Sequence, residues 1–421
     1  MPDQSGESEG RYHMLPIQRI ARLILPVSLC LGLAACAGPE KSPAGLWDAT
    51  ITTLGGVEVP FRFEISGDPP TFSGSFFDGD LRRISGPGSF TNGQLVLPFD
   101  EYGAKVEVAY KDDRLEGKYD RGTRGKPYPF KAVRAVATPA PAGAVPSIEG
   151  EWRIPLDKLS SKGESAWRMV VRQTGAEASA AIMRVDGDTG TLTGSYKDGT
   201  FTLSHFSGAR PSVLQVTPAG DGSLQLVEDR KTGRVAYRET DARAKAAPLP
   251  TDPTHHIGVV DPSAKFTFSF PDLEGKIVSN TDPQFQGKVV IVSLTGTWCP
   301  NCHDEAPFLA QLYKDYRRKG LEIVALAFEE PAQLKDLSRV RAFIKQYSIT
   351  YPFLIAGDSD HEAEALPQAV NLNTFPAMFV LGKDGRVRAT HAGYASKATG
   401  QYYMQEQQEF LAEIDRLLAE N

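Results

Sequence analysis

Two cysteines separated by two residues are the most chemically informative feature of the sequence. Cys299 and Cys302 lie within Trp298-Cys-Pro-Asn-Cys302, after an apolar run at 288–295 and before apolar residues at helical spacing. This pattern places the pair at a strand-to-helix turn. The unpaired N–H groups at a helix N-terminus favour a thiolate on the first cysteine. Such a thiolate attacks a substrate disulfide, and a second cysteine one turn away resolves the mixed disulfide.

Cys299 and Cys302 are the only two of the four cysteines expected in the folded part of the chain. Cys30 and Cys36 both lie in or just after an apolar N-terminal segment. A disulfide scaffold is therefore excluded. A structural zinc site needs four ligands, and the sequence has no second Cys-x-x-Cys, so zinc is the weaker interpretation. We expect no metal or organic cofactor, because the electrons of disulfide exchange travel on the thiols.

The N-terminus has the layout of a secretory signal. Arg19 and Arg22 precede a largely apolar stretch, 23–33, that is too short for a confident membrane span. The sequence therefore predicts a signal peptide over residues 1–35. Translation starts at Met1 or at Met14, and both starts stay open.

The signal ends in Leu33-Ala-Ala-Cys36, which resembles a bacterial lipobox with Cys36 as the lipidated residue. The alternative is an ordinary signal peptide cut after Ala35, but that cut prefers a small residue where Leu33 stands. We therefore expect a lipid-anchored, extracytoplasmic protein of the bacterial cell envelope, on the periplasmic face. The resemblance also implies that Ala37, which is not an aspartate, favours the outer membrane.

Composition limits the remaining possibilities. The chain has 421 residues, of which 41% are hydrophobic and 23% are charged, as in ordinary soluble proteins. The net charge of −6 gives no indication of nucleic-acid binding. A mature chain of about 385 residues suggests two or three domains.

An internal repeat occupies the N-terminal half. Gly45-Leu-Trp47 matches Gly150-Glu-Trp152, and the segment 72–79 matches 192–199. Short alternating runs with Gly, Asp and Asn turns surround both copies, and Asn92-Gly93 is a strong hairpin signal. The repeat predicts two antiparallel all-β modules, each a barrel or a sandwich, with the tryptophans in their cores. The sequence does not reveal what these modules do.

The last part of the chain alternates strands and helices, which predicts a central mixed sheet with helices on both faces. The predicted fold class is therefore multidomain, with two all-β modules followed by an α/β domain. The predicted segments are a signal peptide at 1–35, a tether at 36–44, β module 1 at 45–135, a Pro/Ala linker at 136–147, β module 2 at 148–240, a second linker at 241–264 and the α/β domain at 265–421.

Residues 265–421 resemble the TlpA/ResA-like branch of the thioredoxin superfamily, which is related to the AhpC/TSA proteins and contains thiol–disulfide oxidoreductases. The resemblance depends on Trp298-Cys-Pro-Asn-Cys302, Glu305-Ala-Pro-Phe308 and Thr374-Phe-Pro376, in this order. It implies a thioredoxin fold in which Cys299 is the nucleophile and Cys302 the resolving thiol. It also implies that Pro376 is cis and packs beside the disulfide.

The sequence departs from the family pattern at two positions. Ser293 stands where many thioredoxins carry a buried aspartate, so proton handling would pass to Glu305. Alternatively, Glu305 only complements the helix dipole. Phe375 stands where Thr or Val is more common, so partner specificity does not carry over from the family. The residues expected to shape the substrate groove are Trp298, Pro300, Asn301 and Phe375.

Three neighbouring titratable residues are expected to contribute less. Asp304 is expected to face solvent, and Glu329 to be a loop charge. His303 is a weaker candidate for stabilising a thiolate.

Together these features predict a membrane-anchored protein-disulfide reductase. The uncharged Pro300-Asn301 dipeptide favours the reducing direction. The expected partners are disulfide-containing envelope proteins and a transmembrane thiol donor, and cytochrome c maturation is one process that such a reductase serves. Two alternatives stay open. A peroxiredoxin-type peroxidase shares the fold, but its Pro-x-x-x-Thr-x-x-Cys pattern fails at Val292 and Gly296. A surface binding protein could use the cysteines only as a redox sensor.

Overall fold

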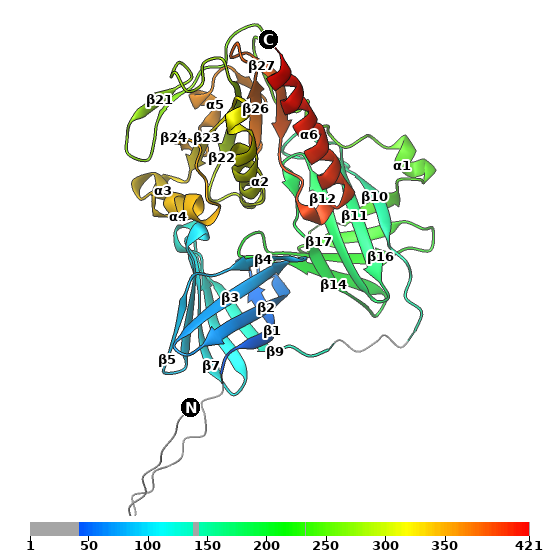
Figure 1. Ribbon diagram of the computed structural model, residues 1–421. Helices are drawn as coiled ribbons and strands as arrows, with labels where there is room; N and C mark the ends of the chain where they lie inside the picture. The colour runs from blue at the N-terminus through cyan, green and yellow to red at the C-terminus, as the bar shows by residue number, and fades with distance from the viewer. Residues whose placement is uncertain (1–41, 138–142, 232, 421) are drawn as a thin grey trace, which may run out of the picture. The chain divides into compact units, whose positions relative to one another are not determined.

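The computed structural model describes residues 42–137, 143–231 and 233–420 (Figure 1). The predicted signal at 1–35 and the predicted lipidation residue Cys36 lie outside the described residues. The described residues belong to one compact unit. Along the chain they form two all-β modules and then a C-terminal α/β domain.

The first nine strands form an antiparallel barrel, called module 1 below (Figure 1, blue to cyan). The sheet order is β2-β1-β9-β8-β7-β6-β5-β3-β4, and β2 also pairs with β3. This extra pairing closes the sheet, and β4 extends from β3 as a hairpin. The strands are β1 (Gly45–Thr52), β2 (Glu58–Asp68), β3 (Thr71–Asp78), β4 (Leu81–Ile84), β5 (Gly88–Thr91), β6 (Gln94–Phe99), β7 (Ala104–Lys111), β8 (Arg114–Asp120) and β9 (Tyr128–Arg134).

Turn chemistry explains where these strands reverse. The Asn92-Gly93 dipeptide joins β5 to β6, and Thr91 pairs with Gln94 across the turn. Both turn residues have positive φ, 51° for Asn92 and 73° for Gly93, as the favoured two-residue hairpin turns require. The predicted hairpin is therefore confirmed.

The next nine strands form a second barrel, called module 2, with the same pairing pattern. Its order is β11-β10-β18-β17-β16-β15-β14-β12-β13, and the pairing of β11 with β12 closes it. The internal repeat is therefore a repeat of topology. The strands are β10 (Gly150–Pro155), β11 (Ala166–Thr174), β12 (Glu177–Arg184), β13 (Gly187–Asp188), β14 (Leu192–Lys197), β15 (Thr200–His205), β16 (Ser212–Pro218), β17 (Leu224–Glu228) and β18 (Arg234–Arg238).

The two tryptophans of the repeat occupy equivalent places. Trp47 and Trp152 are both almost completely buried in their barrel cores, as expected. The indole Nε1–H of Trp47 donates to the Pro43 carbonyl at 3.0 Å, and that of Trp152 donates to the Ile148 carbonyl at 2.9 Å. Each indole thus pairs its polar atom while its rings fill the core.

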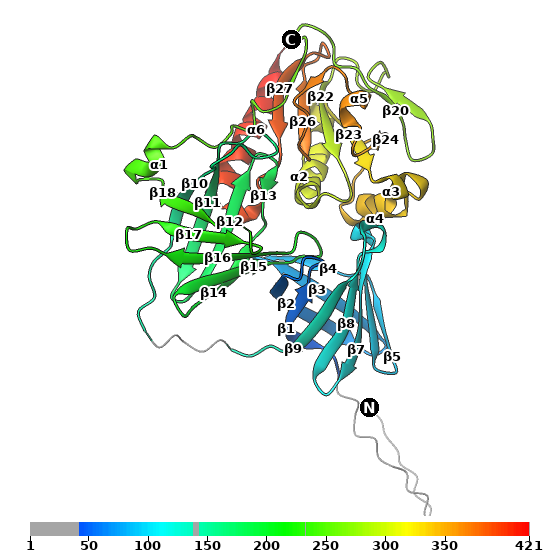
Figure 2. The same cartoon turned by 180° about the vertical axis from the view of Figure 1, so that it is seen from behind.

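The C-terminal domain contains a five-stranded mixed sheet, ordered β24-β23-β22-β26-β27 (Figure 2). Strands β22, β23 and β24 are parallel, and β26 runs antiparallel to β22. Its strands are β22 (Val289–Thr295), β23 (Leu321–Glu329), β24 (Phe353–Asp358), β26 (Ala377–Leu381) and β27 (Val387–Ala392). Its helices are α2 (Pro300–Tyr316), α3 (Pro331–Lys335), α4 (Ser338–Gln346), α5 (Glu362–Ala365) and α6 (Gln401–Ala419). The shorter elements between module 2 and this sheet, or at its edges, are α1 (Ala242–Ala246), β19 (Gly258–Val259), β20 (Ser269–Pro271), β21 (Ile277–Ser279) and β25 (Ala369–Val370).

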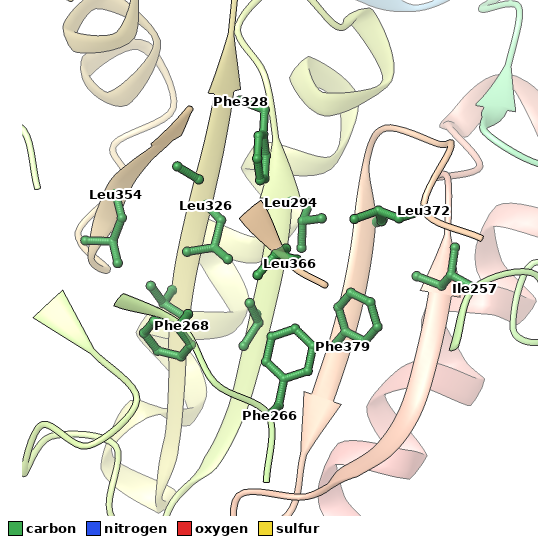
Figure 3. Close-up of a cluster of buried hydrophobic side chains, with 14 of the residues drawn as sticks. Ile257, Phe266, Phe268, Leu294, Leu326, Phe328, Leu354, Leu366, Leu372 and Phe379 are labelled. Atoms are coloured by element: carbon green, nitrogen blue, oxygen red, sulfur yellow. The ribbon is translucent and has the colours of Figure 1, made fainter. Parts of the chain in front are cut away.

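The two faces of this sheet are covered differently. Alternate residues of β22 enter two separate hydrophobic clusters, as the two-residue period of a strand requires. One cluster contains the buried faces of α2, α4 and α6. The other is covered largely by nonhelical segments, whose Phe266 and Phe268 pack near Phe379 and Leu326 (Figure 3). The prediction of helices on both faces was therefore wrong for the long helices, because aromatic side chains from extended segments cover the second face.

The helical segment after β23 is broken into α3 and α4. Asp336 has extended backbone angles between α3 and α4, and its carboxylate accepts a hydrogen bond from the Ser338 N–H at 3.0 Å. An aspartate side chain that bonds the backbone N–H two residues on favours a turn and competes with continuation of the preceding helix.

Candidate active site

The cysteine pair lies where the sequence predicted, between β22 and α2. Cys299 is the N-cap residue of α2, and Pro300 occupies the first helical position, where its fixed φ is favourable. The Cys302 N–H donates to the Cys299 sulfur at 3.3 Å. Both cysteines are free thiols. The helix therefore directs a backbone N–H at the sulfur that would carry negative charge.

The two cysteines are both buried but differ in their surroundings. Cys302 is 1% exposed, and burial together with Cys299 and Glu305 raises its pKa well above the ordinary value. Cys302 therefore remains a thiol until a base takes its proton. Cys299 is 3% exposed and lines a cavity, described below.

The loop before β26 completes the sulfur environment. The Phe375–Pro376 peptide bond is cis, as the family resemblance implied. The Cys299 thiol donates to the Phe375 carbonyl oxygen at 3.4 Å. The loop thus places a backbone carbonyl directly beside the Cys299 sulfur.

Two aromatic side chains flank the pair. The Trp298 and Phe375 rings pack edge to face, with their centroids 5.2 Å apart. The Trp298 indole N–H donates to the Phe328 carbonyl at 2.9 Å, which fixes the orientation of the ring. Both aromatic residues line the same cavity as Cys299.

Glu305 is a buried acid held by the serine that replaces the usual aspartate. Its side chain accepts a hydrogen bond from the Ser293 hydroxyl at 3.1 Å. Burial raises the pKa of Glu305 to about 8, although the bond from Ser293 opposes this shift. In the described part of the chain, its second carboxyl oxygen has no hydrogen-bond partner. A carboxyl group with this pKa can accept and release a proton near neutral pH.

Asp304 does not face solvent, so that expectation was wrong. Its side chain is only 5% exposed and forms an ion pair with Arg83 of module 1. A second ion pair, at 3.4 Å, joins it to Arg210 of module 2. Asp304 therefore anchors the first turn of α2 to both barrels.

Glu329 and His303 also differ from expectation. Glu329 is fully buried, accepts the Thr297 N–H at 2.7 Å and pairs with Arg339 at 3.1 Å, so it is not a loop charge. His303 is fully buried as well, and both of its ring nitrogens are engaged, one by the Tyr347 hydroxyl and one by the Thr297 carbonyl, each at 2.9 Å. Neither nitrogen is left for a thiolate.

No sequence pattern indicates that module 2 reaches the cysteine motif. The Asn301 side-chain amide donates to the Asp186 carbonyl at 2.5 Å. A cavity of about 430 Å³ beside Cys299 is lined partly by module 2, including Arg184 and Arg210. The repeat pattern locates module 2 in the sequence but carries no information on which of its loops meets α2.

Within 42–137, 143–231 and 233–420, no three His, Cys, Asp or Glu side chains gather as a metal site would require. Over the same residues, none of the helices is long and apolar enough to cross a membrane.

Comparisons with known proteins give one consistent result. A family model described as Redoxin matches residues 260–403. The thiol-disulfide oxidoreductase ResA of Bacillus thuringiensis subsp. konkukian (strain 97-27) is 34% identical over 137 residues, which cover 32% of this chain and 72% of that protein. The thioredoxin-like protein YneN of Bacillus subtilis (strain 168) is 29% identical over 141 residues, which cover 34% of this chain and 76% of that protein.

Among solved structures, a putative thiol:disulfide interchange protein DsbE from Chlorobium tepidum is 22% identical. The aligned region covers 36% of this chain and 98% of the Chlorobium tepidum chain, and the TM-score is 0.28. The sequence match to ResA spans more than two thirds of that relative and coincides with the domain that carries Cys299 and Cys302. The chain therefore belongs to the ResA-like family of thiol-disulfide oxidoreductases.

Proposed function

We propose that the protein is a membrane-anchored, extracytoplasmic reductase of protein disulfides, in which Cys299 attacks and Cys302 resolves. The observation that carries this proposal is the asymmetry of the two thiols. Cys299 lies at the start of α2 with the Cys302 N–H on its sulfur, whereas Cys302 is held as a buried thiol. One sulfur is thus prepared for attack and the other for a later step.

The reaction balances on the two cysteines alone. The Cys299 thiolate attacks one sulfur of the substrate disulfide, and the other substrate sulfur leaves as a thiolate that takes a proton from solvent. The Cys302 thiol then loses its proton, and its sulfur attacks Cys299. This step releases the second substrate thiol and leaves the Cys299–Cys302 disulfide. The protein loses two electrons and the substrate gains two.

Glu305 is the base proposed for the second step. Its charge is among the groups that raise the Cys302 pKa, which indicates that the carboxyl and the thiol interact electrostatically. With its own pKa at about 8, a fraction of Glu305 is ionised at neutral pH and can accept the Cys302 proton. Ser293 holds the carboxyl in place.

The proposed location depends on the N-terminal sequence. The apolar stretch 23–33 and the Cys36 lipobox support export and lipid attachment. A reductase outside the cytoplasm must be reduced again, so a transmembrane thiol donor is its expected partner. Replacement of Cys36 by serine should move the protein from the membrane fraction to the soluble fraction. If the Cys36→Ser protein stays with the membrane, lipid anchoring at this residue is wrong.

Trapping a mixed disulfide tests the assignment of the two sulfurs. Cys302→Ser should accumulate a mixed disulfide at Cys299 with a disulfide substrate, detected as a mass increase that dithiothreitol removes. Cys299→Ser should form no such adduct and should lose all turnover. Trapping on Cys302 in the Cys299→Ser variant would reverse the two roles. Rapid consumption of hydrogen peroxide would instead support the peroxidase alternative.

The direction of transfer is tested by the reduction potential of the pair. A value near or below about −220 mV supports a reductase, and a value near −120 mV makes the protein an oxidant. If the protein still binds a partner after both cysteines are replaced by serine, the sensor alternative is favoured.

A further inference from the structure

The polar cavity beside Cys299 is formed jointly by the C-terminal domain and module 2. It measures about 430 Å³ and is lined by Cys299, Asn301 and Phe375 on one side and by Lys162, Arg184 and Arg210 on the other. This volume is within the range of ligand sites, roughly 300–1,000 Å³. A substrate that reaches the reactive sulfur through this cavity therefore contacts module 2 as well.

A tight contact fixes module 2 against the cysteine motif. The Asn301 amide donates to the Asp186 carbonyl, and the Ser396 N–H donates to the Asp188 carboxylate, both at 2.5 Å. Gly187 between them has φ of 120°, and a Cβ there would lie 2.5 Å from the Asn301 amide nitrogen. The turn 186–188 thus lies directly on the segment between the two cysteines. A flat, folded surface is excluded from that side of the motif.

A second cavity continues from the first along module 2. It measures about 640 Å³, and Lys162, Arg184 and Asp186 line both cavities. Its wall includes Trp167, and the Arg184 guanidinium lies 4.4 Å from the centre of that ring. The two cavities adjoin at these three residues, where Lys162 forms an ion pair with Asp186, and together they are called the module 2 groove below.

The groove near Cys299 offers hydrogen-bonding groups of both kinds. In the described residues, Nε of Arg184 and of Arg210 are donors without a partner. Among the same residues, Oδ1 of Asn301 and a carboxyl oxygen of Glu362 are acceptors without one. All four side chains line the cavity, and Asn301 is only 5% exposed. Buried polar groups are normally paired, so these atoms indicate a ligand that supplies acceptors and donors together.

We propose that the module 2 groove binds an extended chain segment that carries the substrate disulfide. A peptide backbone presents one donor and one acceptor at each residue, which matches the unpaired groups of the groove. A folded surface cannot enter the groove, and a small disulfide would occupy only the cavity at Cys299. The inference extends the proposed function, because it assigns to module 2 the role of holding the chain while Cys299 attacks.

Two probes with the same reacting bond test the proposal. One is a short unstructured peptide whose single cysteine is disulfide-linked to thionitrobenzoate. The other is N-acetylcysteine amide with the same link, which has no flanking chain. Cys299 of the prereduced protein attacks the cysteine sulfur of either probe and releases the coloured thionitrobenzoate anion, and Cys302 then releases the cysteine thiol.

The expected result is a preference for the peptide. Its second-order rate constant should exceed that of the single-residue probe by about tenfold or more, since a few contacts are enough for that factor. Arg184→Gln and Lys162→Gln should each lower this ratio toward one. Lys197→Gln, at an exposed position of β14 outside both cavities, is the matched control and should leave the ratio unchanged.

The ratio of the two rate constants distinguishes failure of the groove proposal from failure of the proposed function. Both probes count the same active molecules, so partial misfolding of a variant does not change the ratio. A ratio near one in the unmodified protein, or a ratio that both groove variants leave unchanged, overturns the proposal. If neither probe releases thionitrobenzoate from the reduced protein, the proposed function itself has failed.

Discussion

Modules 1 and 2 share one strand order, yet they meet the C-terminal domain in different ways. Module 1 supports the outer side of the α2 N-terminus, where Tyr102 stacks on His303 at 4.2 Å and Arg83 pairs with Asp304. Module 2 contacts the cysteine motif itself through Asn301 and lines the cavity at Cys299. One barrel thus positions the helix that carries the thiols, and the other forms part of the cavity wall beside Cys299.

The two barrels are also filled differently. The core of module 1 is rich in aromatic rings, and one of them comes from module 2. Phe206, after β15, packs against Phe61 at 5.0 Å and against Phe76 and Tyr119 at 5.1 Å each. The core of module 2 is mostly aliphatic, with Phe201 among its few aromatic residues. The duplicated fold has therefore become asymmetric, both in the residues that fill each barrel and through the loop that places Phe206 in the module 1 core.

The strongest test of this asymmetry exchanges two phenylalanines for alanine. Phe206 and Phe201 both belong to the module 2 segment of the chain, and both rings are buried. Replacing either one by alanine should lower the free energy of unfolding by about 3–5 kcal/mol. The location of the loss should differ. Hydrogen exchange should show module 1 loosened by Phe206→Ala and module 2 loosened by Phe201→Ala. If Phe206→Ala loosens only module 2, the loop does not belong to the module 1 core.

The next largest effect is expected at the shared carboxylate. Arg83→Met removes the closer partner of buried Asp304 and should cost about 3 kcal/mol, because a buried charge then loses its main compensation. Arg210→Met should cost less, because its contact is longer and its side chain is 28% exposed. Denaturant unfolding of both variants measures which substitution lowers the free energy of unfolding more. Equal losses would show that the modules contribute equally to holding α2.

A third prediction concerns the pH dependence of stability, which here arises from buried Glu305 in the C-terminal domain and not from either barrel. Folded Glu305 keeps its proton up to about pH 8, whereas the unfolded chain releases it near 4.5. The folded state therefore binds more protons between these values, and the free energy of unfolding should fall as pH rises through this window. Glu305→Gln should remove that part of the slope.

The same variant tests the proton-transfer role of Glu305. Glu305→Gln should slow resolution of the mixed disulfide by roughly 100-fold, the lower end for loss of a general base, and leave the first attack unchanged. Rapid-quench measurement of the two steps distinguishes them. A slower first attack with normal resolution would instead assign Glu305 to the dipole of α2.

The smallest effect compares equivalent arginines of the repeat. Arg134 lies 4.1 Å from the centre of the Trp47 ring, and Arg238 lies 4.4 Å from that of Trp152. Each arginine should contribute about 0.5–1 kcal/mol through its cation–π contact. Arg134→Ala should cost slightly more, because Arg134 also pairs with Asp113 at 3.1 Å. Thermal unfolding measures the difference, and a larger loss for Arg238→Ala would contradict it.

Local patterns predicted the parts of the structure that depend on local chemistry. The strand-to-helix turn at Cys299, the hairpin at Asn92-Gly93 and the cis bond before Pro376 all follow from neighbouring residues or from a family motif. The repeat predicted two modules, and closure into barrels appears in their pairings. These features need no information about distant contacts.

Long-range pairings left no signal in the sequence. Asp304 resembles any charged residue in a first helical turn, and its partner Arg83 is 221 positions away. Module 2 reaches Asn301 through the carbonyl of Asp186, a group that every residue possesses. By contrast, the break at Asp336 had a readable signal, since an aspartate side chain readily bonds the backbone N–H two residues on and so favours a turn.

The packing of Phe206 has a consequence for how this chain can be shortened. A truncation that removes module 2 alone also removes a ring from the interior of module 1. A truncation that removes module 1 alone leaves Phe206 and Ala209 without the apolar surroundings that now bury them. Successive trimming from the N-terminus therefore passes through a damaged intermediate, and a fragment that keeps both barrels avoids this loss.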